Sequence, residues 1–518
     1  MTQSPATSNK STLPADWVAG RVLSQADVEQ LRDLLAAGSG SACSPHAAAA
    51  GIASRMVAGL HPITTAIAKI ASLLEPLVRI ATSPTGFVVI ALVLSLPLIW
   101  NPGYFSHDEL QWLAFADKPS LADIPWRAWF DFGPFQYRPL TFNLWLLLSH
   151  YFGYQPISMH LLRALFGIAA AWLLRCVLLQ FEVSARRATV VCWIWLLTPY
   201  TVYTHGWIGT YADSLCLIFM LMALRLILMQ PAGTWRQSVS SALPVAALTV
   251  LALMSKESAV VFPAVILIAA IRRRDRILAA AFAASSAVLL AYLALRLQTI
   301  LFPHEVSGAY RWGLDNIPAR LAEYTVFPFM AGHFEVIAGR SYLTVASLLC
   351  LAIFAAALAS TGWRRFVVFW LGWIVMLGPV LILALSANHY AYLAGAFACA
   401  CVGCVWNRAK LLAKLAFAII AVVIAVHGIQ GTRQIRHIGR VQHHLYADLM
   451  PLLAHGTTSI RIQAQRNKDD FILRRLLNDI PSYRRQAIGD HVSVIDFSDK
   501  VDHPDYVMSG DGHLIPAR

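Results

Sequence analysis

The sequence predicts an all-α polytopic membrane protein with about eleven membrane-spanning helices. Of its 518 residues, 58% are hydrophobic and only 13% are charged, whereas a soluble domain carries about 25% charged residues. Apolar runs also recur along the chain, each close to the ~20 residues that cross a bilayer as a helix. Polar and apolar residues do not alternate with the period of a strand, so the backbone polar groups must be satisfied within helices.

The first 83 residues are expected to form a cytoplasmic N-terminal region. No cleavable signal peptide is visible, because the first ~45 residues are polar and no short apolar core follows a basic start. Residues 24–38, SQADVEQLRDLLAAG, have the pattern of a capped soluble helix. Residues 46–80 are rich in Ala with scattered basic residues, which favours an amphipathic helix leading to the first span.

Residues 84–429 are expected to form the transmembrane domain. The apolar run at residues 140–152, LTFNLWLLLSHYF, is too short to span the membrane. It predicts a helix lying in the membrane interface. The eleven predicted spans are 84–101, 156–180, 188–206, 211–229, 240–255, 257–271, 276–300, 341–360, 364–386, 390–406 and 409–428.

Basic residues select one orientation of these spans. They occupy alternate loops, which should be cytoplasmic, because Lys and Arg collect on that side. The loops 102–155 and 301–340 and the tail 430–518 are then outside, and the N-terminus is inside. The net charge of +13 is distributed over many short loops, so no nucleic-acid partner is expected. The basic residues are Arg186, Arg187, Arg236, RRRDR at 272–276, Arg364, Arg365, Arg408 and Lys410.

The tail, residues 430–518, is expected to be a small extracytoplasmic α/β unit. Its first part, RQIRHIGRVQHH at 433–444, is basic, and SVIDFS at 493–498 has the composition of a strand. The histidines of this basic stretch could bind a metal, but a solvated helix face is the more economical interpretation.

Ionisable residues gather where the predicted spans meet the outer side. Such residues cost roughly 2.5–3.5 kcal/mol within a span on insertion scales, so they mark candidate functional sites. Carboxylates could handle protons, and Arg, Lys and His could hold a phosphate. The alternatives are interface anchors, a helix start at HDEL (107–110), and mutual neutralisation of Lys256 and Glu257. The candidates are Asp108, Glu109, Arg138, His160, Arg163, Asp213, Lys256, His389 and Tyr390.

The order of six motifs resembles the GT-C superfamily of polytopic glycosyltransferases, and within it the protein O-mannosyltransferase group with its relatives that carry tetratricopeptide repeats. This chain departs from the family in three ways: Tyr211 and His389 stand where Arg is usual, and the repeats are missing. The motifs are FSHDE (105–109), YRPLTFNLWLL (137–147), PISMHLLRALFG (156–167), GWIGTYADSLCLIF (206–219), MSKESAVVFPAVIL (254–267) and ANHYAYLAG (387–395).

The resemblance implies transfer of a hexose or mannose-like sugar, with inversion, from a polyprenyl-phosphate donor to a protein or glycan acceptor outside the cytoplasm. It implies that Asp108 is the general base and that Glu109 orients the acceptor or supports the base. Arg138, Arg163, Lys256 and His389 are the candidate phosphate contacts, with Tyr390 beside them, and His160 and Asp213 are secondary site residues.

The same resemblance favours a metal-independent enzyme with no cofactor, although Asp108 and Glu109 together with His107 could hold a divalent metal. The expected location is the inner membrane of a bacterium, with the C-terminus in the periplasm. Two rival functions remain: a transporter or flippase of lipid-linked saccharides, and a GT-C-like scaffold without activity. A flippase would place ionisable groups near the membrane midplane and show internal repeats.

Overall fold

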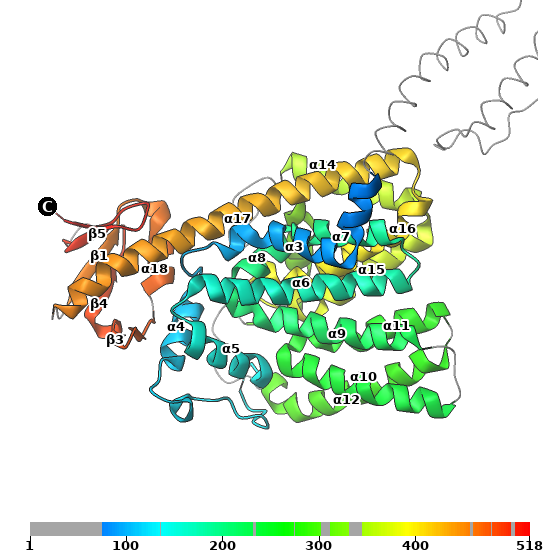
Figure 1. Cartoon of the computed structure of the whole chain (residues 1–518), viewed down its shortest axis with the longest axis horizontal. Coiled ribbons are helices and arrows are strands. Elements are labelled where there is room, and N and C mark those ends of the chain that lie inside the picture. The colour runs from blue at the N-terminus through cyan, green and yellow to red at the C-terminus, as the bar shows by residue number, and fades with distance from the viewer. Residues whose placement is uncertain are drawn as a thin grey trace, which may run out of the picture.

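The computed structural model describes residues 75–517, apart from 135, 231–234, 274, 302–310, 331–343, 456–458, 478 and 499–502. The chain is mostly helical, and a helical bundle carries a small α/β domain at one end (Figure 1). We call this end of the bundle the distal end. The N-terminal predictions for residues 24–38 and for most of 46–80 lie outside the described residues.

A short helix, Glu75–Thr82, leads into the bundle and is bent by 83° from the helix that follows. The helices of the bundle and its loops are α3 Pro84–Ile99, α4 His107–Ala116, α5 Pro139–Phe152, α6 Pro156–Gln180, α7 Ala185–Leu196, α8 Pro199–Gly206, α9 Tyr211–Met229, α10 Trp235–Ser255, α11 Phe262–Arg273, α12 Arg276–Leu301, α13 Ile317–Val326, α14 Val345–Ser360, α15 Trp363–Leu381, α16 Tyr392–Val405 and α17 Leu411–Ala454.

Every one of the eleven predicted spans contains helix, but the described residues contain only six helices that are long and apolar enough to cross a membrane, or seven if the bent pair before and including α3 counts as one. The predicted span 188–206 is not one helix. It is divided into α7 and α8, because Pro199 lacks a backbone N–H and cannot continue the hydrogen bonding of α7. The interval 257–271 likewise begins as a 3₁₀ helix, Glu257–Val261, before α11.

Proline also sets the start of several helices. Residues Pro84, Pro139, Pro156 and Pro199 each occupy the first position of a helix, where a missing N–H breaks no hydrogen bond. The predicted interface segment 140–152 is accordingly a helix, α5, and it packs on α4 at the distal end.

The last membrane helix is longer than its apolar run indicates. The predicted span ends at 428, with the tail starting at 430, but α17 continues without a break to Ala454. The first 25 residues of the predicted tail, 430–454, are therefore helical. Buried residues recur along the extension, among them Ile435, Ile438, Leu445 and Leu449, so packing on neighbouring elements replaces lipid as the partner of its apolar face.

The α/β domain follows α17 and contains one four-stranded sheet with strand order β4-β1-β5-β6. Strand β1 is parallel to β4 and β5, and β6 is antiparallel to β5. Alternate residues of β1 are buried, as the pleat of a strand with one covered face requires. The elements are β1 Ile460–Ala464, α18 Asn467–Leu477, β2 Ser482–Tyr483, β3 Gln486–Ala487, β4 Val492–Ile495, β5 Tyr506–Met508 and β6 Leu514–Pro516.

The α/β domain shares a hydrophobic core with the first loop of the bundle. Leu110 of α4, Leu445 of α17 and Ile460 of β1 belong to the same buried cluster. Next to this cluster, α17 approaches the end of α3 closely: a Cβ atom on Gly103 would lie 2.1 Å from the carbonyl oxygen of Gly439. The domain is thus packed directly on the distal end of the bundle.

Candidate functional site

The acidic pair of the first loop lies in the first turn of α4, and its second member points inward. Glu109 is 3% exposed. Its Oε2 accepts hydrogen bonds from the backbone N–H groups of Phe105 (2.6 Å) and Ser106 (2.7 Å), and its Oε1 accepts one from Ile208 (2.6 Å). Burial raises the pKa of Glu109 to about 7, although the three donors and the charge of Arg475 act to lower it. Glu109 therefore anchors α4 to the segment before α9.

Asp108, in contrast, remains accessible. Its side chain is 37% exposed, and Oδ1 lies 3.0 Å from Nε2 of His107, which is equally exposed. Both side chains stand at the positive end of α4, where a carboxylate is stabilised by the helix dipole. Asp108 lies within electrostatic reach of Tyr203 on α8. Of the acidic pair, only Asp108 is placed to meet a substrate.

Two ion pairs connect α5, α9 and the α10–α11 connection. The Nζ of Lys256 lies 2.5 Å from Oδ1 of Asp213, and both side chains are almost fully buried. The guanidinium of Arg138 binds Oε2 of Glu257 at 2.7–2.8 Å, with 18% and 30% of the side chains exposed. The expected alternative that Lys256 and Glu257 neutralise each other is wrong, because each has a partner on another element.

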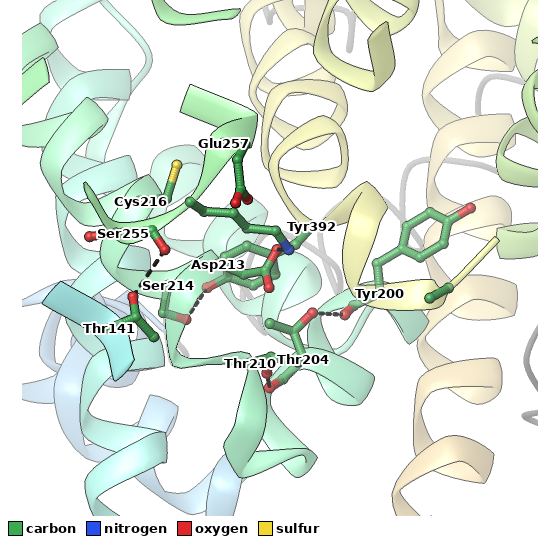
Figure 2. Close-up of polar contacts among 12 residues, drawn as sticks. Thr141, Tyr200, Thr204, Thr210, Asp213, Ser214, Cys216, Ser255, Glu257 and Tyr392 are labelled. Atoms are coloured by element: carbon green, nitrogen blue, oxygen red, sulfur yellow. Dashed lines mark hydrogen bonds and ion pairs between the residues drawn. The ribbon is translucent and has the colours of Figure 1, made fainter. Parts of the chain in front are cut away.

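Figure 2 shows Asp213, Ser214 and Tyr392 together, with Glu257 above them and Thr141 hydrogen-bonded to the carbonyl of Ser255. The hydroxyl of Ser214 donates to that of Tyr392 at 3.2 Å. The α5, α9 and α16 helices are thereby joined to the α10–α11 connection at one level of the bundle.

Arg163 and His160 lie on one face of α6 and form hydrogen bonds inside the bundle. Arg163 is fully buried, and it donates to the hydroxyl of Ser214 (2.7 Å) and the carbonyl of Thr204 (2.8 Å). Nε2 of His160 lies 3.0 Å from the carbonyl oxygen of Gly103. The geometry directs both side chains at the protein's own backbone and hydroxyl groups, so neither faces the accessible end of Asp108.

His389 is enclosed by aromatic rings. It stacks on Tyr203 at a centroid distance of 6.2 Å and meets the edges of Trp207 (4.9 Å) and Tyr390 (4.3 Å). Its Nδ1 is buried and has no hydrogen-bond partner among the described residues. The positive charges of Arg138, Lys256 and Arg475 all act on this ring. His389 therefore lies at the point where cations from three separate parts of the chain converge.

Sequence reasoning missed one of these cations, Arg475, which comes from α18 of the α/β domain. Its guanidinium donates to the carbonyl of Phe105 (3.2 Å) and the hydroxyl of Ser106 (3.1 Å), immediately before Asp108. It also lies 4.6 Å from the centre of the Phe105 ring and 5.7 Å from that of Trp207. Because its hydrogen-bond acceptors are neutral and no carboxylate lies within ion-pair distance among the described residues, Arg475 keeps an unpaired charge beside the acidic turn.

An apolar cavity of about 440 Å³ lies among the helices of the bundle, and none of the candidate site residues lines it. Its walls come from α7, α8 and α14–α17 and include Phe354, Trp373 and Phe417. Tyr200 on its rim belongs to α8, the same helix that carries Tyr203 against His389. The cavity is large enough for part of an apolar chain.

The predicted site residues are thus divided by the structure into two groups. Asp108, Arg138 and Tyr390 keep partly exposed side chains. His389 and Lys256 are buried beside the ring of Tyr390, at 4.3 Å and 5.1 Å from its centre. The remaining candidates, Glu109, His160, Arg163 and Asp213, are buried and have partners within the protein. Among the described residues, no group of three or more His, Cys, Asp or Glu side chains could hold a metal ion.

The chain is similar to the crystal structure of ArnT from Cupriavidus metallidurans bound to undecaprenyl phosphate, with 14% sequence identity and a TM-score of 0.45, over 80% of this chain and 87% of that one. No protein-family model matches the chain, and no curated protein matches it.

Proposed function

We propose that the chain is a GT-C-type membrane glycosyltransferase that moves a sugar from a polyprenyl-phosphate donor to an acceptor on the distal side of the membrane. The observation that carries the proposal is the juxtaposition of an accessible carboxylate, Asp108, with the unpaired cation Arg475 and the enclosed His389. The six motifs that resemble this superfamily supply most of these residues. The apolar cavity beside α8 provides room for the prenyl chain.

The chemistry requires few groups. An acceptor hydroxyl attacks the anomeric carbon of the donor, the bond from that carbon to the phosphate oxygen breaks, and the lipid phosphate leaves with the electron pair. Asp108 takes the proton of the hydroxyl as it attacks. Arg475 and Arg138 stabilise the charge that develops on the phosphate. The new bond forms on the opposite face of the sugar, so the configuration inverts.

We further propose that the donor carries a hexose or mannose-like sugar and that the acceptor is a protein or glycan in the periplasm of a bacterium. The N-terminus of the chain is then in the cytoplasm. No metal is needed for this sequence of steps, since arginines provide the positive charge. Asp108 and His107 alone offer too few ligands for a stable divalent site.

The test is to purify the protein in detergent, add radiolabelled polyprenyl-phosphate hexoses one at a time, and follow release of the lipid phosphate with and without a chelator. We expect consumption of at least one donor, unchanged by the chelator. Loss of consumption with chelator contradicts metal independence. Binding without consumption of any donor rejects the enzyme and leaves the inactive scaffold, while movement of an intact donor across vesicle membranes identifies a flippase.

A further inference from the structure

A second cavity lies between α3, the end of α7 and α17, and its lining is more polar than that of the first. Its volume is about 370 Å³. One wall is apolar and the other is basic, and none of the lining residues belongs to the candidate site described above. The lining residues are Leu94, Pro97, Leu197, Ile429, Thr432, Arg433, Arg436 and Arg440.

The three arginines occupy one face of α17, since they are spaced by three and four residues. All three are exposed, and no hydrogen bond or ion pair engages their guanidinium groups within the described part of the chain. Three like charges within two helical turns repel one another, which costs stability unless an anion lies between them. The cavity therefore combines a basic wall with the need for a negative partner.

The position of this cavity along α17 limits what the partner can be. Leu411 begins the helix, and Arg433 lies about 33 Å further along at 1.5 Å per residue. A bilayer's hydrocarbon core is about 30 Å thick. If Leu411 lies at one edge of this core, the arginines lie at the level of the phosphate groups of the opposite leaflet, while Leu94, Pro97 and Leu197 face the first carbons of the lipid chains.

We infer that this cavity is a binding site for the phosphate head group of an anionic lipid, separate from the candidate site at Asp108. Arg is suited to this role because its planar guanidinium can donate two hydrogen bonds to one phosphate. The apolar wall favours a lipid over free phosphate, because the nonpolar side chains of Leu94, Pro97 and Leu197 line the cavity beside the arginines and suit a hydrocarbon chain. The inference does not depend on the proposed enzyme activity.

The test measures binding of dioctanoyl phosphatidylglycerol to the full-length protein in neutral detergent, with zwitterionic dioctanoyl phosphatidylcholine and inorganic phosphate as comparison ligands. The test variant is Arg433→Gln/Arg436→Gln/Arg440→Gln. The matched control, Arg408→Gln/Lys410→Gln/Lys414→Gln, removes three cations at and just before the start of α17, and none of them lines either of the two cavities described. We expect the test variant to bind phosphatidylglycerol at least about tenfold more weakly and the control to bind it like the wild type.

A further variant, Arg433→Lys/Arg436→Lys/Arg440→Lys, keeps the three positive charges. It tests the site even if the glutamine variant fails to fold. We expect it to bind with intermediate affinity, because Lys cannot form the two-bond contact. Equal losses of affinity in the test and control variants would show that lipid binding depends only on the overall charge of the protein, and this would overturn the site. Wild-type affinity in the test variant would also overturn it. Inorganic phosphate that binds as tightly as the lipid would overturn the assignment to a lipid.

Discussion

Asp108 and Glu109 are neighbours in sequence with opposite roles in the structure. Ser106 is the N-cap of α4, so Asp108 and Glu109 occupy its second and third positions. The third position is where a Glu reaches back to the N-cap backbone in a capping box. The signal S-x-x-E was visible in the sequence at Ser106–Glu109, and it could have indicated that Glu109 is committed to the helix start while Asp108 is free.

The buried carboxyl of Glu109 predicts a pH-dependent stability. Its pKa is raised to about 7 in the folded protein from 4.5, so between these pH values the folded state holds a proton that the unfolded state releases. Stability is then greatest below pH 4.5 and decreases as the pH rises through 7, by up to about 3 kcal/mol. Thermal unfolding in detergent from pH 4 to 8 measures this. The Glu109→Gln variant, which has no carboxyl group to titrate at this position, should lack this decrease, and an equal decrease in the variant would assign it to another group.

The buried pair Asp213–Lys256 predicts strong coupling between two residues. Replacement of Lys256 by Met leaves the Asp213 carboxylate unpaired in a buried site, which costs about 3–5 kcal/mol. The double variant Asp213→Leu/Lys256→Met removes both charges and should recover most of this loss. Unfolding free energies of the two single variants and the double variant form the required cycle. Additive losses would mean that the two side chains do not interact.

At the scale of elements, apolar runs located the helices of the bundle but not all of their ends. The end of α17 was missed because the apolar run stops near 428, while the helix continues by packing on the first loop and on the α/β domain. The break between α7 and α8 was missed because Pro199 lies inside a mostly apolar run that is long enough to be one span. The apolar composition of a segment indicates that it can be a helix in lipid or in the protein core. It indicates less well at which residue the backbone hydrogen bonding of that helix ends.

Close packing of α17 against the α7–α8 break gives a prediction for this element. A Cβ atom on Gly428 would lie 1.9 Å from the carbonyl oxygen of Leu197, whereas one on Gly378 in α15 would have nothing within 4 Å. We expect Gly428→Ala to destabilise the protein by about 1–3 kcal/mol, because backbone must move. Gly378→Ala should leave the melting temperature unchanged or raise it, since Ala favours a helix. Equal melting temperatures for the two variants would contradict the packing.

At the scale of the whole molecule, the α/β domain completes the candidate site. The ionisable residues at span ends could be identified from the sequence, because such residues are rare in apolar runs. Their pairing could not, and neither could the contribution of Arg475, which lies more than 360 residues after Asp108 and reaches it only through the fold of α17 and α18. The sequence therefore indicated most members of the candidate site without indicating which of them are buried and which remain exposed.

The contribution of the α/β domain predicts a binding defect. The Arg475→Gln variant loses a charged contact with the donor phosphate and should bind a polyprenyl-phosphate sugar about tenfold more weakly, since a hydrogen bond to a charged group contributes about 1.5–3 kcal/mol. The control is Arg474→Gln, because Arg474 pairs with Asp470 and Asp496 within the domain. Equal affinities for both variants would remove Arg475 from the phosphate site.

The central claim is that Asp108 removes the proton of the acceptor at this site, and single-turnover release of lipid phosphate tests it most directly. Asp131→Asn is the matched control, because Asp131 is an exposed carboxylate of the same loop. We expect Asp108→Asn to bind the donor with wild-type affinity and to release lipid phosphate at least about 100-fold more slowly, while Asp131→Asn behaves as the wild type. Release by Asp108→Asn at the wild-type rate would contradict the claim.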